Sequence, residues 1–168
     1  MDFIDPSKTC PKYPFLMCRI DQLVNAIASH PRISFLNAFQ GYHQIPLALG
    51  DQEKTTFVIP TGNYHYKVMP FGLKNAGSTY QRMITRMFEP QLGKSIEVYT
   101  DDMVVKSKLV SEHVGDLRSI FEILRKHKLH LNASKCSFGV ESGKFLGYMV
   151  THHRIEVNPY QIKAINNL

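Results

Sequence analysis

The sequence predicts an α+β domain with the ferredoxin-like βαββαβ order, an antiparallel sheet and its helices on one face. Apolar runs of strand length alternate with amphipathic segments of helical period. Two of these runs flank a tight turn in "EVYTDDMVVKS" (97–107), and an insertion (42–70) follows the first strand. At 168 residues, the chain has the length of about one domain.

The first elements follow from local spacing. Apolar residues at helical intervals predict a helix over 19–29, and "ISFLNA" (33–38) has the apolar run of a buried strand. The insertion contains a hairpin around 61–63, where threonine, glycine and asparagine favour a turn. Without the first helix and the insertion, the remaining order is strand, helix, strand, strand, helix, strand.

The second half of the chain supplies the rest of this order. Its predicted elements are a helix over 75–89, strands "SIEVY" and "MVVKS", a helix over 111–128, strands "CSFGV" and "KFLGYMV", and an amphipathic helix that Pro159 opens. The long helix ends in Arg125, Lys126 and Lys128, which complement the helix dipole.

Composition narrows the class of partner. A net charge of +6 and a pI near 9.2 favour a polyanionic partner. Cys10, Cys18 and Cys136 form no disulfide framework, which suggests a reducing compartment. The sequence has no signal-peptide pattern and no apolar run near 18 residues. We expect an intracellular protein of the cytoplasm, the nucleus or both, neither secreted nor in a membrane.

Adjacent acids in the hairpin indicate a metal site. Asp101 and Asp102 repel each other, so a positive partner should offset their proximity. In the βαββαβ order the first strand lies beside the hairpin, so a third ligand belongs near position 37, which is asparagine. Three such oxygen ligands would bind two divalent cations about 4 Å apart, which clamp an in-line phosphoryl displacement. A solvated turn is the alternative interpretation of an isolated Asp-Asp pair.

Ordered sequence blocks then resemble a known family. The blocks are "FLNAFQGYHQIPL", "TTFVIPTGNYHYKVMPFGLKNAGSTYQRMI", "VYTDDMVVKSK", "LHLNASKCSFGVESGKFLGYMV" and "IEVNP". They resemble, in order and spacing, the reverse transcriptases of gypsy-type long-terminal-repeat retrotransposons, most closely those of plants. The resemblance covers nearly the whole chain. It implies a right-hand polymerase fold, with a palm and part of the fingers.

The resemblance assigns roles around the acids. Asp101 and Asp102 match the family's hairpin carboxylates, which are catalytic metal ligands. Asn37 matches the first catalytic position, where the family has aspartate. Tyr99 matches the motif tyrosine, and Thr100 stands at the variable position of the motif.

A second set of residues matches the nucleotide-binding part of the family. Tyr42, next to Gly41, matches the aromatic residue under the incoming sugar, where a ring would clash with a 2′-hydroxyl group. Phe71 and Gly72 match the loop that lines the nucleotide and the template. Tyr42 is also compatible with an ordinary core position, and Phe71 with packing alone.

Two further matches concern the primer and the leaving group. Leu146 and Gly147, in "FLGY", match the primer grip that holds the primer terminus. Lys135 matches loosely a general acid that protonates the pyrophosphate leaving group. Leu146 is also compatible with packing, and a solvated side chain is the commoner role of a lysine such as Lys135.

The resemblance also predicts boundaries, ligands and partners. Residues 1–32 and 42–74 would form partial fingers and connecting parts, 33–41 and 75–150 the palm, and 151–168 the start of the thumb. The implied cofactor is Mg²⁺ or Mn²⁺ in a two-ion site. The implied partners are an RNA or DNA template–primer duplex and deoxynucleoside triphosphates, together with thumb, RNase H and integrase segments of a polyprotein that this chain does not contain.

Two hypotheses about function follow. The first is an RNA-directed DNA polymerase palm, and the second is a catalytically inactive domain that at most binds nucleic acid. Asn37 supplies an amide oxygen but no charge. If the lost carboxylate costs ~4 kcal/mol of metal-stabilised barrier, the rate falls roughly a thousandfold. Residue 37 therefore favours the second hypothesis for present activity, and the incomplete fingers and thumb point the same way.

Overall fold

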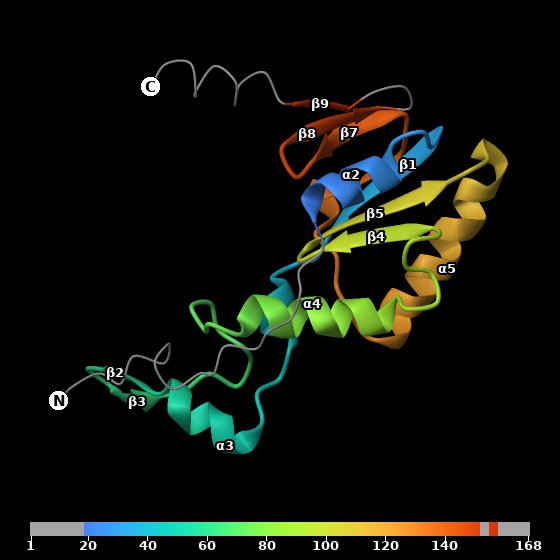
Figure 1. Cartoon of the computed structure of the whole chain (residues 1–168). Helices are drawn as coiled ribbons and strands as arrows, with labels where there is room; N and C mark the ends of the chain where they lie inside the picture. Colours follow the sequence, from blue (N-terminus) through green and yellow to red (C-terminus); the bar gives the residue numbers. More distant parts are fainter. Residues whose placement is uncertain (1–18, 152–154, 158–168) are drawn as a thin grey trace, which may run out of the picture. The chain divides into compact units, whose positions relative to one another are not determined.

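A computed structural model describes residues 19–151 and 155–157 (Figure 1). The chain separates into two compact units. Of the described residues, unit 1 comprises 40–83, and unit 2 comprises 19–39, 84–151 and 155–157. The helix expected from Pro159 lies outside the described residues.

Unit 1 contains short elements and one hairpin. Its elements are η1 (Gly41–Gln44), α3 (Leu49–Gln52), η2 (Glu53–Thr55), β2 (Phe57–Ile59), β3 (Gly62–Tyr64) and the first part of α4 (Ala76–Met87). β2 and β3 pair antiparallel, with Ile59 opposite Gly62. This pairing confirms the hairpin predicted around 61–63.

Unit 2 contains the predicted sheet. Its helices are α2 (Ile20–Ile27), η3 (Val110–Glu112), α5 (His113–Lys126) and η4 (Ala133–Lys135), besides the end of α4. Its strands are β1 (Arg32–Asn37), β4 (Ile96–Tyr99), β5 (Asp102–Ser107), β6 (Ser137–Val140), β7 (Ser142–Phe145), β8 (Tyr148–Thr151) and β9 (Ile155–Val157). Within the described residues, four strands form an antiparallel sheet in the order β4-β5-β1-β6, and α4 and α5 make the crossovers. The predicted βαββαβ order is therefore confirmed.

The register of β1 and β5 defines the two faces of this sheet. Ile33 lies opposite Lys106, and Asn37 lies opposite Asp102. Paired residues of an antiparallel ladder point to the same face, and successive residues alternate between faces. α5 packs against β5 on one face, and α2 lies on the other with β7, β8 and β9 (Figure 1). α2 is thus an addition to the four-stranded sheet, on the face away from α5.

Apolar side chains under α2 form one core. Its buried members are Leu23, Val24, Ile27, Ile33, Val104, Phe145 and Val150. The α2 residues fall at positions i, i+1 and i+4, so one side of a short helix enters the core. Burying each such side chain is worth about 1.5–3 kcal/mol. The core therefore holds the β7–β8–β9 sheet against the main sheet.

A buried ion pair lies on the same face. The Lys106 ammonium donates hydrogen bonds to Glu97 Oε1 at 2.7 Å and to the Ala26 carbonyl oxygen, at the end of α2, at 2.8 Å. The Lys106 and Glu97 side chains are 5% and 8% exposed. The attraction between the two charges offsets the free-energy cost of their desolvation. Either charge buried alone would have no such compensation.

A buried chain of hydrogen bonds lies on the opposite face. The Gly139 N–H group donates to Ser34 Oγ at 2.9 Å, and Ser34 Oγ lies 2.7 Å from His113 Nε2. His113 Nδ1 lies 2.8 Å from Ser107 Oγ, which donates to Asp116 Oδ2. Since a carboxylate only accepts, a neutral His113 with its proton on Nδ1 lets every group donate to the next. The chain joins β1, β5, β6 and α5.

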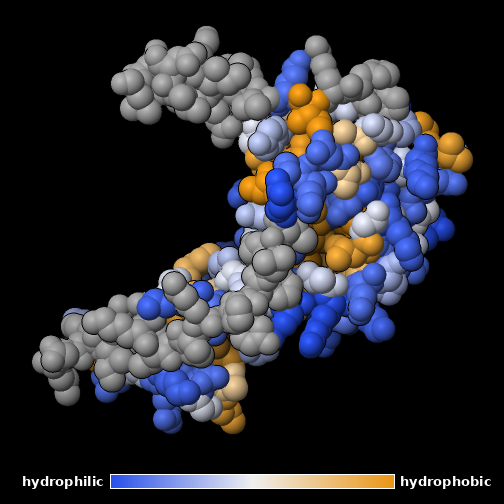
Figure 2. Space-filling view, viewed as in Figure 1, coloured by the Kyte–Doolittle hydropathy of each residue, from blue (hydrophilic) through white to orange (hydrophobic). Residues whose placement is uncertain are grey.

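On the face that Figure 2 shows, most of the described surface is hydrophilic. Hydrophobic residues reach the surface where α5 begins, and Leu109, Val110 and Val114 are exposed there. Of the helices that the structure describes, none has the length and apolar character needed to cross a bilayer.

Candidate active site

The acids occupy the connection between β4 and β5. Tyr99 and Asp102 are a directly opposed pair, so only Thr100 and Asp101 form the turn. Thr100 has a φ of 49°, which a β-branched residue rarely adopts and which costs about 1–3 kcal/mol. The pairing of the two strands fixes this strained turn at the end of the sheet and with it the position of the acids.

The end of β1 meets this turn. The Ala38 N–H group donates to the Asp101 carbonyl oxygen at 2.8 Å. The Asn37 amide Nδ2 donates to Asp102 Oδ1 at 2.8 Å, across the paired positions of β1 and β5. The prediction that position 37 lies beside the two acids is therefore confirmed. The catalytic roles of the three residues stay predictions.

The nature of the Asn37–Asp102 contact follows from charge. An ionised carboxylate only accepts hydrogen bonds, so the amide NH₂ group, not the amide oxygen, faces Asp102. An aspartate at position 37 would place a second negative charge there, and a cation would be needed to hold the two together. The asparagine amide supplies a hydrogen-bond donor in the position where such a cation would act.

The family that the sequence resembles generally uses divalent ions, which need oxygen ligands. In the described part of the chain, no three histidine, cysteine, aspartate or glutamate side chains gather as a metal-binding group. Asp101 and Asp102 carry the hard oxygen ligands that Mg²⁺ prefers, enough for one ion. With Asn37 turned toward Asp102 as a donor, the residues present do not fit a complete two-ion site.

Lys135 lies on the chain segment that borders Asn37. The Asn132 N–H group donates to the Asn37 carbonyl oxygen at 2.8 Å. η4 follows directly and ends at Lys135, whose side chain is exposed. Lys135 therefore lies three residues along the chain from Asn132, which is bonded to Asn37. Its role as a general acid remains a prediction.

The predicted nucleotide-binding residues lie in unit 1 and form an aromatic group. The Tyr42 ring packs edge-on against Phe71 and Tyr80, with ring centroids 5.3 and 5.4 Å apart. Phe71 is 63% exposed, and Gly72 beside it has a φ of 93°, which favours glycine. Gly41 is buried next to Tyr42. The structure thus brings these four predicted residues together.

The predicted primer-grip residues form a different turn of unit 2. Leu146 and Gly147 connect β7 to β8 as a two-residue loop, with φ values of 49° and 86°. Positive φ at both positions is typical of the tight hairpin turns that match strand twist. Leu146 packs against the core under α2, which agrees with its alternative interpretation as a packing residue.

The sequence did not predict a pocket that lies beside the candidate active site. It lies between the end of α5 and the segment that leads back to β1, and Phe121, Arg125 and Leu131 are among its residues. The sequence pattern relates Arg125 and Lys128 only to the helix dipole. The available signal was the sequence from 123 to 140, which contains four lysines and arginines but no aspartate or glutamate.

Comparisons with known proteins agree with this geometry. Residues 3–150 match the family described as "Reverse transcriptase (RNA-dependent DNA polymerase)". The Pol polyproteins of transposons 297 and gypsy from Drosophila melanogaster are 33% and 34% identical over 92% and 94% of this chain. A Tf2 transposon polyprotein of Schizosaccharomyces pombe is 31% identical over 79% of it. The chain spans only 14%, 15% and 10% of these three relatives.

Solved structures show the same fold. A foamy viral protease–reverse transcriptase in complex with an RNA/DNA hybrid matches 96% of this chain with a TM-score of 0.85 and 20% identity. A foamy viral protein in complex with double-stranded DNA matches 99% with a TM-score of 0.88 and 20% identity. The chain covers 22% and 29% of those two proteins.

A βαββαβ sheet that presents two adjacent acids beside the end of its first strand has the architecture of a polymerase palm. The chain belongs to the reverse transcriptase family, as the match over most of its length shows. Its similarity to transposon Pol polyproteins, gypsy among them, confirms the resemblance to long-terminal-repeat retrotransposons.

Proposed function

We propose that this chain is the palm and partial fingers of an RNA-directed DNA polymerase and that it binds a template–primer duplex. The contact of Asn37 with Asp102 carries the proposal, because it places the motif acids beside the end of β1. The net charge of +6 favours a nucleic acid. Similar folds come from foamy viral proteins in complex with an RNA/DNA hybrid and with double-stranded DNA.

In this proposal unit 1 contributes the deoxynucleoside triphosphate contacts. Tyr42 would lie under the sugar, and the packing of its ring against Phe71 and Tyr80 limits its movement. A fixed ring there disfavours a 2′-hydroxyl group by steric contact. Gly72 and the exposed Phe71 would line the nucleotide and the template.

Asp101 and Asp102 would hold a divalent cation, Mg²⁺ or Mn²⁺. When bound, such an ion stabilises negative charge on phosphoryl oxygens. Asn37 adds no charge to this set, so we propose that nucleotidyl transfer is impaired. A cost of ~4 kcal/mol in the barrier corresponds to roughly a thousandfold in rate.

The second candidate function is a catalytically inactive domain that only binds nucleic acid. The hydrogen bond from Asn37 to Asp102 favours it for present activity, because the amide satisfies a carboxylate that a cation would otherwise neutralise. Both candidates share template–primer binding. With either function, we propose a location inside the cell, in the cytoplasm or nucleus. The thumb, RNase H and integrase segments would come from the remainder of a polyprotein.

Binding is tested by fluorescence anisotropy with a labelled RNA/DNA hybrid at increasing salt concentration. Phosphate contacts dominate such binding, so the logarithm of the affinity should fall linearly with the logarithm of salt. An affinity that stays constant between low and moderate salt would contradict the proposal.

Primer extension on poly(rA)·oligo(dT) with Mg²⁺ or Mn²⁺ then separates the two candidates. Extension at an ordinary polymerase rate of about 1 s⁻¹ or more would exclude the inactive domain.

A further inference from the structure

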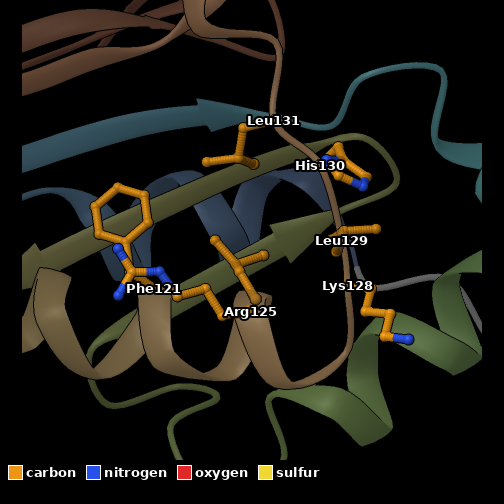
Figure 3. A pocket seen from close by; sticks show the side chains of 7 residues that line it. Phe121, Arg125, Lys128, Leu129, His130 and Leu131 are labelled. Carbon is orange, nitrogen blue, oxygen red and sulfur yellow. The ribbon is translucent and has the colours of Figure 1, made fainter.

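A pocket of about 500 Å³ lies on unit 2 between the last turns of α5 and the segment that returns to β1 (Figure 3). Its lining residues are Phe121, Leu124, Arg125, Lys128, Leu129, His130 and Leu131. The returning segment is anchored to the residues directly after β1, since Leu131 forms a β-bridge with Ala38 and the Phe39 N–H group donates to the His130 carbonyl oxygen at 2.9 Å. Two walls held by backbone contacts therefore define the pocket.

The floor of the pocket is apolar. Leu124 and Leu129 are buried, and Phe121 and Leu131 are partly exposed. Phe121 also packs against Phe138 of β6, with ring centroids 6.1 Å apart, and Phe138 is half exposed. An apolar surface thus runs from the pocket to the edge of the four-stranded sheet.

The rim of the pocket is basic. Arg125, Lys128 and His130 are exposed, and no acidic side chain lines the pocket. In Figure 3, Lys128 and His130 lie at the end opposite Phe121. An anionic ligand with an apolar part therefore complements both rim and floor.

We propose that this pocket binds a short acidic peptide segment that inserts a bulky apolar side chain. A nucleobase is the competing occupant, because aromatic rings with nearby cations also bind single-stranded nucleic acid. The edge of a base carries donors and acceptors that need partners once buried. The leucine side chains of the pocket offer no hydrogen-bond partner to a buried base. An inserted leucine or phenylalanine side chain of a peptide needs no such partner. Flanking carboxylates would then meet Arg125, Lys128 and His130.

The test uses the full chain and three matched panels of fluorescein-labelled peptides, read by anisotropy. In the first panel a leucine or phenylalanine is flanked by aspartates and glutamates. The second replaces the apolar residue by serine, and the third replaces the acids by their amides. The first panel should bind at least about tenfold more tightly than both others, since pocket filling and charge both contribute.

Variants connect this binding to the pocket. Arg125→Gln together with Lys128→Gln should weaken the best peptide at least about fivefold. Lys108→Gln together with Arg118→Gln is the matched control, because it removes the same charge from exposed positions of unit 2 outside the pocket. It should change the affinity less than about twofold. A circular dichroism melt of each variant confirms that it is folded.

Three results would overturn the proposal. The first is a panel of acidic, apolar peptides that binds no better than its serine and amide matches. The second is an equal loss of affinity in the pocket variant and its control. The third is an oligo(dT) strand that displaces the best peptide and loses affinity in the pocket variant alone, which would assign the pocket to nucleic acid.

Discussion

The two ends of the β1–β5 ladder both carry polar groups, yet they are built differently. At one end Ser34, Ser107, His113 and Asp116 form a buried chain in which each donor has an acceptor. At the other end Asp101 lies in the turn and Asp102 begins β5, and the Asn37 amide of the neighbouring strand donates to Asp102. We call these the closed end and the acidic end.

We propose that this difference separates polar groups that hold the fold together from polar groups that bind a ligand. The hydrogen-bonding groups of the closed end find their partners within the protein. These bonds hold β1, β5, β6 and α5 together. The acidic end keeps two adjacent carboxylates, and we propose that a cation would offset their charge. Its strained turn at Thr100 supports the same interpretation, because such backbone conformations cluster at functional sites.

The largest effect is expected when the buried charges near the closed end are unbalanced. Lys106→Met leaves Glu97 buried without its partner and should lower the free energy of unfolding by about 3–5 kcal/mol. Lys106→Met combined with Glu97→Leu should recover most of this loss. Urea unfolding measures both variants. A double variant as unstable as the single one would show that charge imbalance is not the cause.

A smaller loss is expected from Ser34→Ala. This change leaves the Gly139 N–H group and His113 Nε2 without the hydroxyl that joins them. A cost of about 1–3 kcal/mol in unfolding free energy follows, while template–primer affinity should stay the same. Ser119→Ala, at an exposed serine of α5, is the control and should change stability by less than about 0.5 kcal/mol. Equal losses in the two variants would contradict a closed hydrogen-bond chain.

Acid should weaken the closed end through His113. Burial lowers the pKa of His113 below its ordinary 6.5; nearby Asp116 opposes the shift and Arg32 adds to it. The unfolded chain therefore binds a proton at higher pH than the folded chain. The resulting stability is complete above pH 6.5 and is lost as the pH falls below it, by at most about 1.4 kcal/mol per pH unit.

His113→Gln tests this pH dependence by difference. The variant should be less stable at neutral pH, but its stability should fall less steeply than that of the native protein between about pH 6.5 and 5. Urea unfolding across this range supplies both slopes. Parallel slopes would mean that His113 takes up its proton equally in the folded and unfolded chains.

The sequence predicted the sheet because its signals are local. Apolar runs and helical spacing gave the βαββαβ order, and that order placed Asn37 beside Asp101 and Asp102. The bond between Ser34 and His113 joins residues 79 positions apart, so no local pattern could reveal it. Lys106 follows an apolar run and pairs with Glu97 on the adjacent strand, so its burial depended on the register and on α2.

The candidate site was predictable to a similar degree. The hairpin acids and the residues around Tyr42 follow from ordered motifs, and the structure groups them as expected within each unit. The orientation of the Asn37 amide toward Asp102 depends on side-chain geometry that the sequence does not contain. The strain at Thr100 and Leu146 likewise depends on the two-residue turns that the strand pairs impose.

We propose that Asn37 leaves the acidic end one charge short of a metal site. Calorimetric titration of Mn²⁺ into the native protein and into Asn37→Asp tests it directly. Asn37→Asp combined with Asp102→Asn is the control, because it restores the original number of charges with the carboxylate moved to position 37. We expect Asn37→Asp to bind Mn²⁺ at least about tenfold more tightly than both other proteins, a difference of about 1.4 kcal/mol. Equal affinities for the native protein and Asn37→Asp would contradict the account.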